Sequence, residues 1–166
     1  TQTAALAFGG SEPNSPGQWT EEYDGTNWTA QNNLGTGRYQ LMGNNVGTQT
    51  AALCVGGFIS TAKDLVEEYD GTNWTATTAL PTAGGNQMRI GISTAALAAG
   101  GTPGPNDGTK CYSFDGSTWS ATASLATPRS STSGGGSNTA AVDAGAPSNS
   151  ATSEEFNISI NTFTAT

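Results

Sequence analysis

The sequence predicts an all-β fold made of copies of one four-stranded unit, and two observations carry this prediction. A short apolar block, Thr-Ala-Ala-Leu in its clearest form, returns at spacings of 47, 44 and 45 residues, beginning at Thr3, Thr50, Thr94 and Thr139. A second block containing Asp-Gly, the strongest short signal of a β-hairpin, follows each of the first three copies. Self-similarity at this period indicates a repeat architecture. No window shows the 3.6-residue apolar period of a helix.

The apolar block predicts the second strand of each unit. It runs into a glycine pair in three copies, at Gly9-Gly10, Gly56-Gly57 and Gly100-Gly101, and into Gly145-Ala146 in the fourth. A short apolar run that ends at glycine, whose backbone reaches conformations closed to other residues, is typical of a strand buried on both faces.

The Asp-Gly block predicts the third and fourth strands. It spans residues 22–28, 68–74 and 113–119, and its fourth copy is Glu155-Phe156-Asn157 followed by Phe163. Because one sheet cannot bury both of its faces alone, we expect the aromatic residues of this block to pack against the next unit. These residues are Tyr23, Trp28, Tyr69, Trp74, Phe114, Trp119, Phe156 and Phe163.

A third block predicts the first strand. It opens at Leu34, Leu80 or Leu125 and leads to Arg38, Arg89 or Arg129. The segments that follow, residues 38–46, 87–93 and 129–137, are rich in Gly, Ser and Asn. Small side chains suit a strand crowded against a central axis.

These strands together predict a β-propeller of four blades in a single domain. The repeats span about residues 1–37, 38–86, 87–128 and 129–166. The first blade lacks its inner strand, because the sequence begins at a second strand. An open sheet edge invites pairing, so we expect either further blades from the same chain in a larger ring or a neighbouring subunit in a homo-oligomer.

Composition excludes several classes of function. A formal net charge of −8 with only five Lys and Arg residues argues against nucleic acid as a partner. No run of about 20 apolar residues is present, so membrane insertion is not expected. The absence of histidine excludes a Ser-His-Asp triad and histidine-based zinc or copper sites, and no metal or cofactor is predicted. Cys54 and Cys111 fit no metal or redox motif and are predicted to be small buried residues, with a disulfide between them left open.

The carboxylates do not indicate an enzyme. The pairs Glu21-Glu22, Glu67-Glu68 and Glu154-Glu155 recur at one strand position. Neighbours in a strand point to opposite faces, so a pair cannot present both carboxylates to one site, as a glycosidase would need. Asp24, Asp70 and Asp115 precede glycine and are predicted to form turns, since no spaced calcium-binding loop is present.

The order of an arginine, an apolar strand ending in Gly-Gly, Tyr-Asp and then Trp resembles the kelch repeat over the whole chain. The spacing from Asp24 to Trp28 is shorter than kelch repeats usually have, whereas Asn157 to Phe163 keeps the longer one. The resemblance implies a propeller with the Arg-led strand innermost. The near-identical copies are also similar to kelch-like repeats in structural proteins of marine phages and in bacterial surface proteins.

This resemblance implies a non-enzymatic structural or attachment module of an extracellular or virion protein, such as a tail or fibre. The alternative is a carbohydrate-binding propeller of the lectin type, so the expected partner is a protein or a cell-surface glycan. In kelch-like propellers the loop between strands two and three lies on the usual partner face. That loop differs in every repeat here, and our predicted ligand-binding residues are Trp19, Arg38, Arg89 and Arg129. Trp19 is equally well explained as a residue that shields the edge of a blade.

Overall fold

All secondary-structure elements that the computed structural model describes are strands, joined by turns and irregular loops. The described part of the chain comprises residues 3–12, 15–41, 44–102, 108–145, 152–157 and 162–165. It contains strands β1 to β17 and no helix. The described residues therefore include no helix long and apolar enough to span a bilayer. The predicted all-β class is confirmed.

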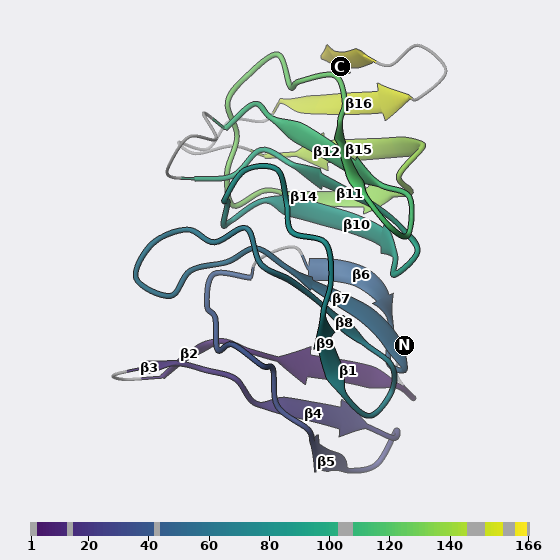
Figure 1. The fold of residues 1–166 in the computed structure, drawn as a ribbon. Coiled ribbons are helices and arrows are strands. Elements are labelled where there is room, and N and C mark those ends of the chain that lie inside the picture. Colours follow the sequence, from purple (N-terminus) through teal and green to yellow (C-terminus); the bar gives the residue numbers. More distant parts are fainter. Residues whose placement is uncertain are drawn as a thin grey trace.

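The strands form four successive units; Figure 1 shows unit 1 at the bottom of the view, unit 2 above it, and units 3 and 4 overlapping in the upper half. Unit 1 contains β1 (Ala5–Phe8), β4 (Thr20–Tyr23) and β5 (Trp28–Gln31). Unit 2 contains β6 (Asn44–Thr48), β7 (Ala51–Val55), β8 (Val66–Tyr69) and β9 (Trp74–Ala76). Unit 3 contains β10 (Met88–Ile92), β11 (Ala95–Ala99), β12 (Cys111–Phe114) and β13 (Trp119–Ala121). Unit 4 contains β14 (Ser133–Gly136), β15 (Ala140–Ala144), β16 (Ser153–Asn157) and β17 (Thr162–Ala165).

Each unit is an antiparallel meander in the predicted strand order. Units 2 and 3 are joined into one eight-stranded sheet, because β6 and β10 pair in parallel, with Arg89 opposite Asn44 and Gly91 opposite Val46. Units 1 and 4 form sheets of three and four strands. A short hairpin, β2 (Ser11–Glu12) with β3 (Ser15–Pro16), extends from the loop of unit 1. No described strand pairs with the free edge of β1, in keeping with the predicted lack of an inner strand in the first unit.

The Asp-Gly segments form the predicted turns. Asp70 Oδ1 accepts hydrogen bonds from the backbone N–H groups of Thr72 at 2.8 Å and Asn73 at 2.7 Å. Gly71 between them has a φ of 91°, which favours glycine. Asp24 and Asp115 hold the corresponding turns of units 1 and 3 in the same way. These hydrogen-bond donors lower the pKa of each aspartate below its usual value, most strongly at Asp115.

A glycine in the first strand of units 2, 3 and 4 lets the first two strands of each unit approach each other closely. A Cβ atom added to Gly47 would lie 2.1 Å from the carbonyl oxygen of Ala51, and its φ of 114° favours glycine as well. Gly91 and Gly136 hold the same position in units 3 and 4, and each lies equally close to the second strand of its own unit. The close contact is made with the second strand of the same unit, and the predicted crowding against a central axis stays a prediction.

The core lies between units, in two clusters of buried side chains. One brings together Leu53 and Val55 of unit 2 with Phe114 and Trp119 of unit 3. The other brings Leu97 of unit 3 against residues of unit 4. In both, the aromatic residues of a unit pack on the preceding unit, whereas the sequence predicted contact with the next one. The prediction for Phe163 concerns a side chain outside the described residues.

The third block also needs a correction. Arg38 and Arg129 lie before β6 and β14 begin, in the connection from the previous unit, while Arg89 lies within β10. The residue that matches Arg38 and Arg129 is Gly84, four residues after Leu80. Its N–H donates to Lys63 O as those of Arg38 and Arg129 donate to Gly17 O and Gly108 O. Counting four residues from the leucine of each block identifies this match. Taking the next arginine after the leucine selects Arg89 in unit 3 and misses it.

Candidate functional site

The most ordered polar feature of the fold is a buried ion pair in unit 2. Arg38 Nη1 donates to Glu67 Oε1 at 2.5 Å, and both side chains are almost fully removed from solvent. The carboxylate also accepts the N–H groups of Gly35 at 2.7 Å and Thr36 at 3.3 Å. Glu67 of β8 therefore fixes the connection that arrives from unit 1. We call this arrangement the arginine clamp.

Unit 4 contains a second arginine clamp. Arg129 Nε donates to Glu154 Oε1 at 3.1 Å, and the same carboxylate accepts the N–H groups of Ala126 and Thr127. Arg129 further donates to the carbonyl oxygens of Gly145 and Thr152. A buried charge with this many partners is satisfied, so the clamp serves folding.

Unit 3 replaces the arginine clamp at three positions together. Tyr112 occupies the place of Glu67, Gly84 the place of Arg38, and Pro81 the place of Gly35. Proline has no N–H to donate and glycine has no charge to neutralise, so a carboxylate here would lack its partners. Instead the Tyr112 hydroxyl bonds to Thr82 Oγ1 at 2.8 Å. The three changes together remove the carboxylate, the guanidinium that would pair with it and one of its N–H donors.

Arg89 enters the same interior from a different strand. Its side chain is fully buried, and Nη2 donates to Gln87 Oε1 at 3.3 Å. Burial, together with the positive charge of nearby Arg38, lowers the pKa of Arg89 to about 10. The thiol of Cys54 lies between these two cations, 2.9 Å from Arg38 Nη2.

Both cysteines are buried, as predicted, and the structure answers the open question of a disulfide, since both thiols are free. Burial raises the pKa of the Cys54 thiol to about 11 and that of Cys111 to about 12. A buried thiol that stays protonated is a poor nucleophile and metal ligand. Over the described ranges, no group of three or more His, Cys, Asp or Glu residues is placed to hold a metal ion.

The Glu-Glu pairs divide between the two sides of their strand. Glu67 and Glu154 are buried, whereas their neighbours Glu68 and Glu155 are exposed. A pair therefore does not present two carboxylates to one site, as the alternation of strand residues requires.

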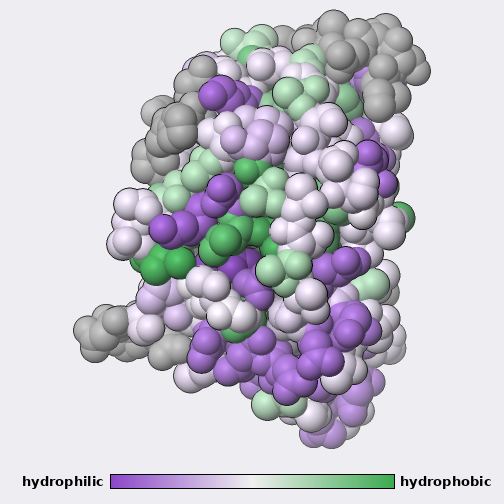
Figure 2. All heavy atoms as spheres, viewed as in Figure 1, coloured by the Kyte–Doolittle hydropathy of each residue, from purple (hydrophilic) through white to green (hydrophobic). Residues whose placement is uncertain are grey.

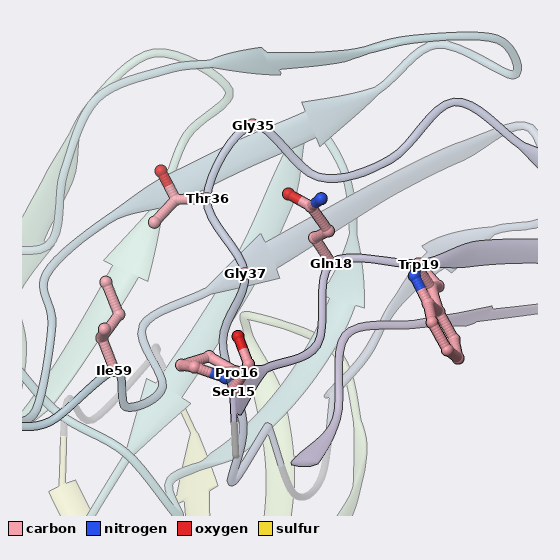
Figure 3. Close-up of a pocket in the computed structure, with 8 residues that line it drawn as sticks. All are labelled: Ser15, Pro16, Gln18, Trp19, Gly35, Thr36, Gly37 and Ile59. Atoms are coloured by element: carbon pink, nitrogen blue, oxygen red, sulfur yellow. The ribbon is translucent and has the colours of Figure 1, made fainter. Parts of the chain in front are cut away.

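The clearest surface site is an open pocket of about 510 Å³ between the loops of units 1 and 2. Figure 3 shows its lining: Trp19 stands at one edge, Ile59 at the opposite side, and the Gln18 side chain points toward the segment of Gly35 and Thr36. The remaining lining residues are Ser15, Pro16 and Gly37. None of these residues carries a charge, although the chain as a whole is acidic.

The arginine clamp of unit 2 lies directly behind this pocket. The N–H groups of Gly35 and Thr36, which line the pocket, donate inward to Glu67. Arg38 N donates to the carbonyl oxygen of Gly17, next to Gln18. These bonds hold two loops of irregular structure in fixed positions, so the pocket has a rigid wall.

The four predicted ligand-binding residues lie in different parts of the structure. Trp19 is 62% exposed and lines the pocket. Arg38 and Arg129 are buried in the two arginine clamps, and Arg89 is buried near Cys54. A ligand-binding role for any of the four stays a prediction. Gln18, Thr36 and Ile59 also line the pocket, although the sequence did not single them out. Gln18 and Ile59 belong to loops that differ between repeats, whereas Thr36 stands at a position that repeats as Thr82 and Thr127.

No protein-family model matches the sequence, and no curated protein is significantly similar to it. Function is therefore inferred from the geometry of the chain itself.

Proposed function

We propose that this chain is a kelch-like β-propeller segment and a non-enzymatic attachment module of an extracellular or virion protein of the tail or fibre type. Two backbone features support radial packing of the units. The inner strands β6 and β10 run parallel, as neighbouring inner strands do around an axis. A run of hydrogen bonds links one position in consecutive units, from Ser131 N to Asn86 O and from Asn86 N to Gln40 O.

The pocket beside Trp19 is the observation that carries the attachment role. The buried charges shared between units are committed to internal contacts, and the repeated aspartates are committed to turns. The loop pocket instead combines an exposed tryptophan with uncharged polar side chains on a braced wall. Tryptophan supplies a large contact area at little cost in conformational entropy, which suits a binding surface.

The alternative function, a carbohydrate-binding propeller, is favoured by one property of the same pocket. Its lining offers an indole ring, two hydroxyl groups and an amide, from Trp19, Ser15, Thr36 and Gln18, and no charge. An uncharged pocket with a few placed polar groups is suited to a neutral polar ligand. A saccharide is such a ligand.

A binding assay with two readouts tests the proposal. The labelled chain is applied to a panel of marine bacterial cells and to a saccharide array. An attachment module that recognises protein binds cells without saccharide preference, whereas a lectin selects saccharides on the array. In either case Trp19→Ala should weaken binding about tenfold or more, as expected for a central aromatic contact.

Ile92→Ala is the matched control, because Ile92 is 55% exposed and lies outside the pocket. This variant should bind as the wild-type chain does. Cell or saccharide binding that Trp19→Ala leaves unchanged would exclude the pocket as the contact surface. No binding to either panel would count against the attachment role.

A further inference from the structure

Units 1 and 2 recognise each other through a specific set of polar contacts. The Tyr69 hydroxyl donates to Glu22 Oε1 at 2.9 Å, and Trp74 Nε1 donates to Thr20 Oγ1 at 2.8 Å. The Trp74 ring also meets Phe8 edge-on, with ring centroids 4.8 Å apart. One face thus supplies a Tyr-Trp donor pair, and the other supplies a carboxylate and a hydroxyl as acceptors.

The outward face of unit 1 carries the same donor pair. Tyr23 lies directly opposite Trp28 across β4 and β5, as Tyr69 lies opposite Trp74 across β8 and β9. The rings of Tyr23 and Trp28 are 5.2 Å apart and tilted by 34°, close to the 4.9 Å and 33° of the unit 2 pair. Trp28 is 50% exposed, because no described residue covers this face.

The outward face of unit 4 carries the matching acceptors. Ser153 and Glu155 of β16 occupy the positions of Thr20 and Glu22 in β4. Glu155 lies opposite Val142 as Glu22 lies opposite Leu6, so an apolar residue accompanies the carboxylate in both sheets. Val142 is 38% exposed, and the Glu155 side chain is exposed.

The contact between units 2 and 3 lacks this set. Unit 2 has Val66 at the hydroxyl position, and unit 3 has Phe114 at the tyrosine position. Trp119 Nε1 is buried with no hydrogen-bond partner among the described residues. The contact between units 1 and 2 thus joins a donor pair to its acceptors. The two outward faces carry the same two sets, with the donors on unit 1 and the acceptors on unit 4. Such matching favours the correct partner, since a donor pair without acceptors would be left unsatisfied.

We infer that the outward face of unit 1 binds the outward face of unit 4 in a second copy of this chain. Figure 1 shows the two sheets at opposite ends of the molecule, so one copy cannot join its own faces without a large rearrangement. The contact is head-to-tail, which closes into a ring if the rotation between copies allows and otherwise continues as a row. The inference extends the proposed propeller and involves neither the Trp19 pocket nor a ligand.

Sedimentation velocity of the 166-residue chain at rising concentration tests the inference with two face variants. Trp28→Asp removes the tryptophan donor of the pair and brings a negative charge to the face that should meet Glu155. Val142→Asp sets a negative charge toward Glu21 of the other copy. Each variant alone should associate at least about tenfold more weakly than the wild-type chain, since each loses apolar contact and gains repulsion.

Mixing the two variants is the decisive measurement. The Val142→Asp copy keeps an intact unit 1 face, and the Trp28→Asp copy keeps an intact unit 4 face. The mixture should therefore form a dimer through one wild-type contact, which neither variant forms alone. Ile92→Asp, a charge on an exposed residue outside both faces, should associate as the wild-type chain does, and circular dichroism should show that all variants remain folded.

Glu21→Gln provides a second, independent readout. Glu21 lies on the outward face of unit 1, opposite Ala7, and its exposed carboxylate would lose water in the contact. Its neutral replacement should strengthen association severalfold. A wild-type chain that stays monomeric up to about 100 µM would overturn the inference. So would a dimer that survives Val142→Asp, because that result means that like faces meet, and so would a mixture that stays monomeric.

These results separate the two proposals. Loss of association with ligand binding intact leaves the attachment role standing, because the Trp19 pocket lies within one copy. Association without ligand binding leaves the present inference standing and rejects the attachment role.

Discussion

The guanidinium of Arg38 and the carboxylate of Glu67 meet at 2.5 Å inside the protein, between a connection and a strand that are far apart in sequence. The contact neutralises a buried charge and also provides an acceptor for buried backbone N–H groups. The connection has backbone N–H groups turned toward the interior, and the carboxylate accepts two of them together with the arginine. A buried charge is tolerated only with such partners.

Removing the charge of Glu67 should therefore cost a large part of the stability. Glu67→Gln leaves Arg38 buried without its counter-charge, and the free energy of unfolding should fall by about 3 kcal/mol in urea denaturation. Glu68→Gln is the matched control, since Glu68 is the exposed neighbour on the same strand, and it should change stability by less than about 0.5 kcal/mol. Equal effects of the two variants would show that the clamp does not stabilise the fold.

The clamp cannot be transferred to unit 3 by one substitution. Tyr112→Glu places a carboxylate where Pro81 and Gly84 offer neither an N–H at the first position nor a guanidinium. The variant should be destabilised by about 2 to 4 kcal/mol, as expected for an uncompensated buried charge. Tyr112→Phe is the comparison: it loses the single hydrogen bond to Thr82, and its cost should be about 1 kcal/mol. A Tyr112→Glu variant as stable as Tyr112→Phe would contradict this account.

Two tryptophans at the same repeat position should differ in their effect on stability. Trp74→Ala removes the ring contact with Phe8 and the hydrogen bond to Thr20, and it should lower the free energy of unfolding by about 3 kcal/mol. Trp28→Ala, measured at a concentration where the chain is monomeric, should cost about 1 kcal/mol or less, since half of its surface is already in water. An unchanged melting temperature for Trp74→Ala would reject its packing role.

The three turn aspartates should make stability depend on pH in acid. Backbone N–H donors lower the pKa of Asp24, Asp70 and Asp115 in the folded state. Protons therefore bind the unfolded chain more readily, and the contribution is present above about pH 4, the unfolded pKa, and is lost as pH falls through the folded values. The melting temperature should drop between about pH 4 and pH 2.

Replacement of the three turn aspartates by asparagine tests this assignment. Asparagine keeps an acceptor oxygen for the turn but does not titrate, so the acid-dependent drop in melting temperature should shrink. Asp64→Asn is the control, since Asp64 is exposed and lies outside the turns. A drop that is as steep in the triple variant as in the wild-type chain would show that other carboxylates cause it.

Local patterns determined the elements of this protein. In the first three units Asp-Gly before Trp specified the hairpin between the third and fourth strands, because its hydrogen bonds run between neighbours in sequence. The apolar block specified the second strand, because a short run of Ala and Leu ended by glycine suits few other structures. These signals predicted the strand order of all four units without reference to any distant residue.

Contacts between distant residues decided the rest. Counting from the leucine aligns Gly84, and not Arg89, with Arg38, but only the tertiary structure shows that these positions make the same backbone contacts. The sequence does not reveal that the aromatic residues face the preceding unit, since a strand pattern separates two faces without saying which neighbour each one meets. Figure 2 shows hydrophilic side chains gathered over unit 1 and hydrophobic ones over the middle of the molecule.

The sequence by itself thus determined what repeats, where strands turn and which chemistries are missing, since these depend on residue types and short spacings. The tertiary structure alone decided which charges are buried in the clamps, where Trp19 stands beside its pocket and which faces remain uncovered. Those properties depend on side chains that meet across units, and a chain's spacing along the backbone does not encode which distant surfaces come into contact.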